Sequence, residues 1–523
     1  MSSHKTLLRQ IFLFGFFLFL LDGCSKKESD FEKDIIAHVG DYKISVRDFQ
    51  LNYEFGFAHL KTKGNEKLSY LEYMIDEVLL SQEGYRLELD LSEQIKNKEK
   101  VLLKELLVEE LFKKEVDDKI NISDDEIKDA ISKSRVKWKL RYWVEPDLKD
   151  AEQVYSSIQK RGYEDVVQEL LNNQEVKSNI KNYETDYLTW LDIPPMLLEK
   201  IKDLQINKIS KPIKIDNVFI LVEITEITSN IIADYDYKTA SDKYKQILFY
   251  REQKKQTAVF LKSFMNPKEV TTKGDGFSYI LNALVAWKNS DTTTITFEDA
   301  IENANESEPE LLLLKNHYED ILVTFKDGSW SIKDFLTRFN TSKITAKASE
   351  KRKIYNQLNH QIAITLRNHF FVEEALLHDL DKSADVKNEL KIWRDKWVYD
   401  ELRRGLTSDI KIDEATALEY FNTHKNNYKT KTGIEPTFNE FGNQAKHDAY
   451  FSQTFSILEN KINLLKKDFS VRINRELLDS IKVLDSEKSR WSTVFLLKGN
   501  NSRIAIPTVD PSWGLKSGTQ INN

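Results

Sequence analysis

The residue with the most distinctive chemistry in this sequence is Cys24, the only cysteine among 523 residues. A sole cysteine cannot form an intramolecular disulfide, so any role of its thiol must be of another kind. Cys24 closes an N-terminal block in which Lys5 and Arg9 precede the uncharged apolar run Ile11–Leu21. This order of charge, apolar core and small residue is typical of a secretory signal, and the run is shorter than the roughly 20 residues of a membrane-spanning helix. We therefore expect residues 1–23 to be removed as a signal peptide.

The sequence Leu21-Asp22-Gly23-Cys24 resembles the lipobox of bacterial lipoproteins, in which a small residue precedes a cysteine that is lipidated and becomes the new N-terminus. Asp22 departs from the small or apolar residue usual at its position. The resemblance implies lipidation of Cys24 and a polar tether over residues 24–33. Two or three acyl chains, at about 0.8 kcal/mol per buried methylene, give lasting membrane attachment. The alternative is an ordinary cleaved signal with an incidental cysteine.

The resemblance to lipoproteins also bears on the location of the protein. Ser25 is not the acidic residue that retains some lipoproteins in the inner membrane. This favours the periplasmic face of the outer membrane within a bacterial cell envelope.

Composition and charge argue against several kinds of site. The chain has a net charge of −7, and loss of residues 1–23, with two cations and one anion, makes it −8. A mildly acidic chain gives no electrostatic reason for binding nucleic acid. One cysteine excludes a paired-cysteine metal site, the histidines are scattered, and no Gly-x-Gly-x-x-Gly or P-loop pattern occurs. The sequence therefore predicts no cofactor, no metal and no catalytic residues of these classes.

Two long stretches without proline, residues 1–145 and 310–435, are the natural places for helices, because proline removes a backbone donor and clashes with the preceding turn. Apolar residues recur at helical spacing in both stretches. They are Leu103, Leu106, Leu107, Leu111 and Phe112 in the first, and Val386, Leu390, Trp393, Trp397 and Leu402 in the second. We interpret both stripes, including the two tryptophans, as the core of helical bundles.

The two stretches also resemble each other. Ile44-Ser45-Val46-Arg47-Asp48-Phe49 corresponds to Trp330-Ser331-Ile332-Lys333-Asp334-Phe335, 286 residues later, and both carry the Ser-x-x-Asp spacing of a helix capping box. Ile122-Ser123-Asp124 corresponds to Ile412-Asp413-Glu414, 290 residues later. The shared order of a short strand, a helix start, long helices and a second capped helix favours internal duplication. The alternative is a chance match of two common helix starts.

A resemblance to a known family covers the chain from about residue 34 to 230. It is carried by Ile36-Ala37-His38-Val39-Gly40-Asp41, Leu71–Leu80, Leu188-Thr189-Trp190-Leu191 and Leu221–Ile227. In this order the segments resemble the SurA and PrsA group of periplasmic folding factors, in which a helical chaperone module flanks a parvulin-type (PpiC) prolyl isomerase domain. The resemblance implies a helical chaperone module over residues 34–132 and a parvulin-like domain over residues 136–228.

The parvulin-like region lacks the polar residues that the resemblance requires of an active isomerase. Parvulins carry one histidine in the first strand and one in the last. The matching positions here are Arg141 or Tyr142 and Ile220, and no histidine lies between His59 and His317. The usual turn glycines are replaced by Thr189, Asn207 and Val218.

The apolar floor of the parvulin pocket is better kept, as Trp190, Ile193 and Leu197. Together with Arg141, Tyr142 and Ile220, these residues form a possible proline or peptide pocket without a catalytic pair. The alternative is that the three apolar residues are the plain core of a small domain.

These observations predict a mainly α fold with α+β, in which SurA-like helical chaperone modules flank a small parvulin-like domain. After residue 228 we expect a long helix over residues 236–265, a connection over 276–321, a second helical module over 322–425, and a C-terminal helix with a mixed tail over 426–523. Within that tail one amphipathic helix should pack back onto a helical module. Its apolar stripe is Phe451, Phe455, Leu458, Ile462 and Leu465.

Three functions are compatible with the sequence. The first is a membrane-anchored periplasmic chaperone, a holdase, that binds unfolded or nascent envelope and outer-membrane proteins over its helical modules. The second is an active peptidyl-prolyl cis-trans isomerase, against which the missing histidines count. The third is a structural or adaptor lipoprotein of an outer-membrane assembly. The sequence leaves the oligomeric state open, and an aggregation-suppression assay beside a prolyl isomerase assay would separate the three.

Overall fold

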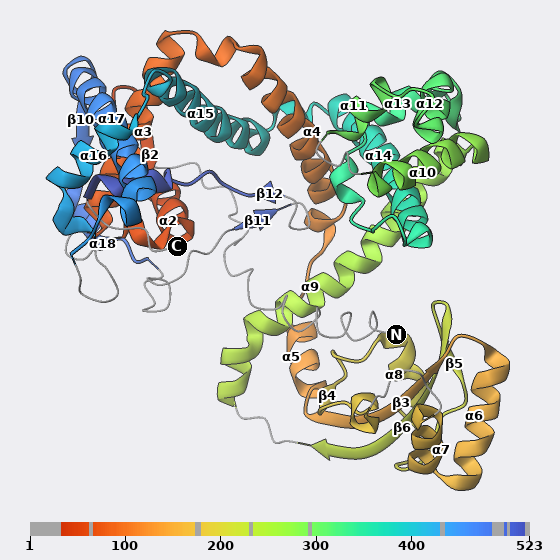
Figure 1. Cartoon of the computed structure of the whole chain (residues 1–523). Coiled ribbons are helices and arrows are strands. Elements are labelled where there is room, and N and C mark those ends of the chain that lie inside the picture. Colours follow the sequence, from red (N-terminus) through yellow and green to blue (C-terminus); the bar gives the residue numbers. More distant parts are fainter. Residues whose placement is uncertain are drawn as a thin grey trace. The chain divides into compact units, whose positions relative to one another are not determined.

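A computed structural model of the chain describes residues 33–61, 66–172, 179–229, 234–290, 295–428, 435–483, 496–498 and 503–517 (Figure 1). The expected signal peptide and Cys24 lie outside these residues. The described part is mainly helical with small antiparallel sheets, which confirms the predicted class of mainly α with α+β. No helix within these ranges is long and apolar enough to cross a membrane.

The chain divides into two compact units. Unit 1 combines Met1–Leu107 with Asp379–Asn523, and unit 2 is Val108–His378. One division falls inside helix α4 (Glu93–Glu115), so the units differ from the expected modules at 34–132 and 322–425. The physical reason is that helix α15 (Ala384–Thr407) packs against helix α3 (Glu66–Arg86), which joins parts of both sequence stretches in one unit.

Unit 1 contains a three-stranded antiparallel sheet in the order β10 (Val471–Ile473), β1 (Ile35–Val39), β2 (Tyr42–Ser45). Helix α2 (Val46–Phe55) begins directly after β2. The backbone N–H of Asp48 donates to the Ser45 hydroxyl, and the Asp48 carboxylate accepts from the backbone N–H of Ser45. This capping box satisfies donors that the first helical turn leaves free, and it fixes where α2 starts.

The helices α3, α15 and α17 (Phe438–Asp468) lie side by side in unit 1 (Figure 1). They share a core whose members are fully or nearly fully buried. These include Tyr70, Leu71, Leu79, Tyr399, Leu402, Phe455, Leu458, Ile462, Leu465 and Trp513. The predicted amphipathic helix of the tail is therefore confirmed as α17, and it packs back as expected. Unit 1 also includes α16 (Glu414–Thr423), α18 (Arg475–Ser480) and the 3-10 helices η2 (Ala58–Leu60) and η10 (Pro511–Ser517).

Unit 2 begins with the end of α4 and helix α5 (Asp124–Lys133), followed by an α+β domain. Its antiparallel sheet has the order β4 (Leu188–Thr189), β3 (Val136–Glu145), β6 (Val218–Ser229), β5 (Ile213–Ile215). Helices α6 (Leu148–Arg161) and α7 (Tyr163–Asn172) contribute to one apolar cluster and α8 (Pro195–Ile201) to the other.

The rest of unit 2 is a second helical assembly. Helix α9 (Asp234–Met265) occupies the place of the long helix expected over 236–265. The stretch 276–321, expected as a connection, contributes α10 (Gly274–Asn289), α11 (Phe297–Glu302) and α12 (Pro309–Asn316) to a common core. That core also includes strand β8 (Ile321–Phe325), helix α13 (Ile332–Leu336) and helix α14 (Lys351–Leu377).

The predicted internal copy is visible in the backbone geometry of the two halves. Strand β8 pairs with β9 (Gly328–Ser331) as β1 pairs with β2, and each ladder has an irregularity at the same place, between Ile35 and Ala37 and, 286 residues later, between Ile321 and Val323. Ser331 and Asp334 repeat the capping box of Ser45 and Asp48.

The copy continues into the helical hairpins. The turn after α3 places Glu88 at φ 56°, and the turn after α14 places Asp379 at φ 55°. Non-glycine residues seldom adopt this left-handed conformation, so its recurrence at matching turns supports duplication over chance. Each turn leads through a 3-10 helix, η3 (Leu89–Leu91) or η8 (Leu380–Lys382), into the next long helix.

The third strand of each small sheet comes from the other copy of the repeated pattern. Strand β10 follows α17 and pairs with β1, whereas β7 (Thr271–Thr272) follows α9 and pairs with β8. The flanking contacts also correspond: Asn474 N–H donates to the Ile36 carbonyl, and Lys273 N–H to the Leu322 carbonyl. Each copy of the repeated pattern thus completes a sheet that begins in the other copy. In the sequence, the α+β domain lies between α5 and α9, whereas 14 residues separate α16 from α17.

Candidate peptide-binding sites

The two faces of the α+β sheet separate the residues predicted to form a proline or peptide pocket. Tyr142 pairs with Val222, and Val144 with Ile220, on the face that α8 covers. Ile193 and Leu197 belong to the same cluster and are only 1% and 9% exposed. The structure therefore brings Tyr142, Ile193, Leu197 and Ile220 together, with Ile193 and Leu197 in the core of the domain.

Arg141 lies on the opposite face of this sheet, paired with Glu223 in the ladder. Its guanidinium forms ion pairs with Glu164 at 2.9 Å, Glu184 at 3.1 Å and Glu223 at 4.0 Å. Burial raises the pKa of the Glu223 carboxyl, and Arg141 opposes that rise. Of the two residues predicted to match the first parvulin histidine, Arg141 thus forms ion pairs with three carboxylates on the face opposite to Ile193 and Leu197. Tyr142 lies in the apolar cluster with Ile193 and Leu197, and burial raises the pKa of its phenol.

Trp190 connects this domain to two neighbouring helices. Its indole N–H lies 3.0 Å from the Ala130 carbonyl oxygen and 3.1 Å from the Ser134 hydroxyl, at the end of α5. The Arg251 guanidinium of α9 lies 4.9 Å from the ring centroid and donates to the Trp190 carbonyl at 3.0 Å. Through these contacts Trp190 joins the α+β domain to α5 and α9 within unit 2. Asn207, which the resemblance predicts to replace a turn glycine, adopts the left-handed conformation at φ 61°.

Unit 1 contains a second site that sequence reasoning missed. Residues 503–513, an extended stretch over 503–510 followed by the first residues of η10, lie in a groove formed by side chains of α2, η2, α3 and α15. We call these residues the C-terminal strap. Asn52 binds its backbone on both sides of one residue: the Asn52 amide donates to the Pro507 carbonyl at 3.2 Å, and the Val509 N–H donates to the Asn52 side-chain oxygen at 3.1 Å. The His59 imidazole forms a third contact, 2.8 Å from the Pro511 carbonyl.

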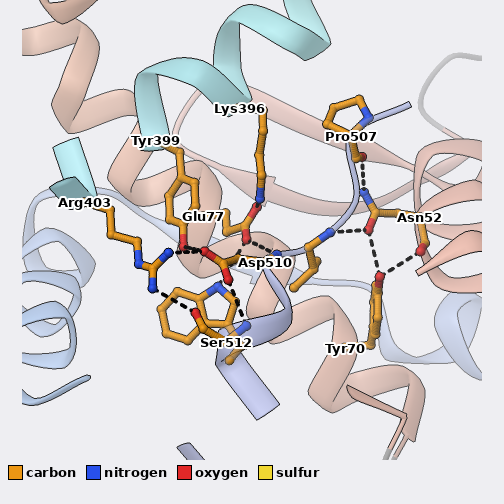
Figure 2. Close-up of polar contacts among 11 residues, drawn as sticks. Asn52, Tyr70, Glu77, Lys396, Tyr399, Arg403, Pro507, Asp510 and Ser512 are labelled. Carbon is orange, nitrogen blue, oxygen red and sulfur yellow. Dashed lines mark hydrogen bonds and ion pairs between the residues drawn. The ribbon is translucent and has the colours of Figure 1, made fainter. Parts of the chain in front are cut away.

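Glu77 of α3 is the centre of the polar contacts in this groove (Figure 2). One carboxylate oxygen accepts from the backbone N–H of Asp510 at 2.7 Å and from the Trp513 indole at 3.1 Å. The other lies 2.8 Å from the Lys396 ammonium of α15. Burial raises the pKa of the Glu77 carboxyl, and the Lys396 charge opposes that rise. Glu77 therefore joins the strap to both long helices.

The Asp510 side chain adds a second set of charged contacts. Its carboxylate pairs with Arg403 and accepts from the Tyr399 hydroxyl at 3.2 Å. Burial alone would raise the pKa of Asp510, but Arg403 and Lys396 outweigh it and hold the pKa below its ordinary value. Arg403 also donates to the Ser512 hydroxyl at 3.0 Å. The strap is thus bound through one acidic side chain as well as through its backbone.

Two apolar side chains of the strap fill pockets in the same groove. Val509 is 1% exposed and Trp513 is fully buried. The Trp513 ring lies 6.0 Å from Tyr73 in a stacked arrangement and 5.7 Å from Phe455. The groove therefore holds an extended segment by side-chain contacts to its backbone, supplemented by apolar pockets. The contacting residues come from positions as far apart as Asn52 and Arg403, so no local sequence pattern predicts this groove.

An open cleft of about 200 Å³ lies beside the strap. Its lining comes from α15, from the residue before η2 and from the start of the strap. The lining residues are Phe57, Trp393, Lys396, Trp397, Asp400, Ile504, Ile506, Pro507 and Thr508. Trp393 and Trp397, predicted as core, do pack against Leu102 and Leu106, but they are only partly buried and line this cleft as well. Their spacing with Asp400 places all three on one face of α15.

Comparison with known proteins gives distant structural similarities. No protein-family model and no curated protein matches the chain. Among solved structures it is similar to the peptidylprolyl isomerase PrsA of Bacillus anthracis, with 16% identity, a TM-score of 0.23, and coverage of 37% of this chain and 96% of that one. For PrsA of Bacillus cereus the values are 15%, 0.21, 42% and 88%. For a SurA-like chaperone structure from Campylobacter jejuni they are 13%, 0.18, 46% and 100%.

Proposed function

We propose that this protein is an envelope chaperone that holds unfolded or nascent proteins on its helical parts. The observation that carries the proposal is the binding of the C-terminal strap through its backbone by Asn52, Glu77 and His59. Backbone groups are the same in every client, so such contacts tolerate any sequence that can lie extended. The open cleft beside the strap offers aromatic surface of the kind that dominates binding energy at interfaces.

The proposal includes attachment of the protein by lipid at Cys24 to the periplasmic face of the outer membrane. It rests on the signal-like block and the sole cysteine. A tether keeps the chaperone near newly exported chains and raises its effective concentration for them. Net charge near −8 limits association between copies that present apolar surface.

The proposal assigns little isomerase activity to the α+β domain. Uncatalysed prolyl isomerisation has a barrier of roughly 18–20 kcal/mol. Arg141 forms ion pairs with three carboxylates on the face of the sheet opposite to Ile193 and Leu197, and the Ile193 side chain is buried. Arg141 is therefore not placed to assist rotation of a proline bound beside Ile193.

Aggregation suppression by a soluble form starting at Ser25 tests the holdase function, with a denatured β-barrel protein as client. Replacing Trp393 and Trp397 together by alanine should weaken protection by about tenfold or more, because large aromatic residues commonly contribute over 2 kcal/mol each to binding. The matched control is Leu464→Ala, since Leu464 is 57% exposed on α17 and lies outside the cleft.

The outcomes separate the functions that the sequence left open. Loss of protection in the tryptophan variant, with the control unchanged, supports a holdase that uses unit 1. Loss of all protection on deleting residues 136–228 alone, with the rest still folded by circular dichroism, would place the function in the α+β domain. No protection by the intact soluble form would instead favour a structural or adaptor role.

A further inference from the structure

One face of α15 forms the floor of the cleft beside the strap. Trp393, Lys396, Trp397 and Asp400 follow each other at spacings of three and four residues, so their side chains project from the same side of the helix. The cleft volume of about 200 Å³ exceeds the 150 Å³ of an apolar cavity that accommodates benzene. Its size therefore fits one large side chain rather than a folded segment.

The charged residues around the cleft are unequally paired. Lys396 forms an ion pair with Glu77 at 2.8 Å, and Arg403, two turns further along α15, forms an ion pair with Asp510. The Asp400 carboxylate has no hydrogen bond or ion pair with any residue within the described ranges. Lys98 of α4, Lys396 and Arg403 act on it only from a distance, and the Asp510 charge repels it. Burial raises the pKa of Asp400, as expected for a carboxyl without a close partner.

We propose that the cleft binds one basic side chain, of arginine or lysine, from an extended client segment, with Asp400 as its counter-charge. Trp393 and Trp397 would pack along the apolar stem of that side chain and attract its cation through their ring faces. The inference rests on the proposed function, because the segment is taken to be part of an unfolded client.

The chain itself provides a precedent for a cation at this aromatic surface. The ammonium of Lys98 lies 5.8 Å from the ring centroid of Trp397. It is too far from Asp400 to form an ion pair, so the carboxylate keeps its capacity to accept a charge-assisted hydrogen bond. A client cation would thus share the Trp397 surface with Lys98 and take the open position at Asp400.

The test compares two short peptides that are extended, apolar and identical except at one central position, which is arginine in one and the neutral isostere citrulline in the other. Their dissociation constants for the full soluble chain are measured by fluorescence anisotropy. We expect the arginine peptide to bind about tenfold more tightly, the size of effect that one charge-assisted hydrogen bond gives. This comparison needs no protein variant, so it is independent of any folding defect.

The second arm uses Asp400→Asn, which keeps the shape of the side chain and removes its charge. The variant should lose most of the preference for arginine and keep only the part that the ring faces of Trp393 and Trp397 contribute. The matched control is Glu401→Gln, because Glu401 is the next carboxylate on α15, pairs with Arg404 at 2.9 Å and does not line the cleft. The control should keep the preference for arginine.

Equal affinity of the unaltered protein for both peptides, or a preference that persists undiminished in Asp400→Asn, would overturn the inference. Its failure is distinguishable from failure of the proposed function. A chain that suppresses aggregation but shows no arginine preference refutes only the role of Asp400. A chain that suppresses no aggregation refutes the holdase function.

Discussion

The carboxylate of Glu77 accepts a hydrogen bond of 2.7 Å from the backbone N–H of Asp510, and the pKa values of the two buried acidic residues shift in opposite directions. The pKa of Glu77 is raised, chiefly by burial. The pKa of Asp510 is lowered, because Arg403 and Lys396 outweigh its burial. This contact joins a helix near the start of the chain to a segment near its end, and it is the centre of unit 1.

Glu77→Gln should destabilise unit 1. The glutamine can still accept from Asp510, but Lys396, whose side chain is 15% exposed, loses the carboxylate that compensates its desolvation. Because a half-broken buried ion pair is costly, we expect the free energy of unfolding to fall by about 2 kcal/mol. Urea unfolding followed by tryptophan fluorescence measures this change. An unfolding free energy equal to that of the unaltered chain would show that the Glu77–Lys396 pair contributes nothing net.

Asp510 should make stability dependent on pH at the acidic end. Its folded pKa lies below the ordinary value of 3.8, so its contribution is present above about pH 3.8 and is lost as the pH falls through the folded pKa. The stability difference between the unaltered protein and Asp510→Asn should therefore be constant near neutrality and shrink only in strong acid. Urea unfolding of both proteins at a series of pH values measures this difference. A gap that closes near neutral pH would contradict the assignment.

The soluble chain should catalyse prolyl isomerisation poorly. Residues 136–228 contain no histidine, and Arg141 is held on the far face of the sheet. On a proline-containing test peptide, we expect a rate close to the uncatalysed one, which takes tens of seconds or more. Tyr142 is the predicted histidine match that lies in the apolar cluster with Ile193 and Leu197, so Tyr142→Phe is the informative variant. Efficiency like that of ordinary parvulins, abolished in Tyr142→Phe, would show that the phenol has taken over the polar role.

Cys24→Ala should abolish membrane attachment. Cys24 is the only thiol in the chain and follows an apolar block typical of a signal. Labelling with palmitate and fractionation of membranes, compared between the unaltered and variant chains, measure the effect. Ser25→Ala serves as control, since it changes the neighbouring residue and keeps the thiol. Unchanged labelling in Cys24→Ala would show that the lipoprotein interpretation is wrong.

Much of the local structure could be predicted from the sequence. Ser45 with Asp48 and Ser331 with Asp334 mark helix starts because the cap contacts span only three residues. The stripe from Phe455 to Leu465 predicted α17 because helical periodicity is a local property. The internal duplication was predicted from the same short patterns. The structure adds that the turns at Glu88 and Asp379 share a left-handed backbone conformation.

The placement of the candidate site residues needed the sheet itself. Arg141 and Tyr142 are neighbours in sequence, and alternation along a strand sends them to opposite faces. Which face α8 covers depends on packing, so the sequence could not decide which of the two lies beside Ile193 and Leu197.

The amino-acid sequence by itself determined the helical character of the chain, its capped helix starts and its duplicated pattern, because these depend on residues a few positions apart. Only the tertiary structure decided that β10 completes the sheet of β1 and that β7 completes the sheet of β8. It alone brought Asn52, Glu77 and Lys396 around the strap at Asp510. Asn52 and Glu77 lie more than 300 positions before Lys396 and Asp510. Their contacts arise from burial of apolar surface across the whole unit, which leaves no periodic signal along the chain.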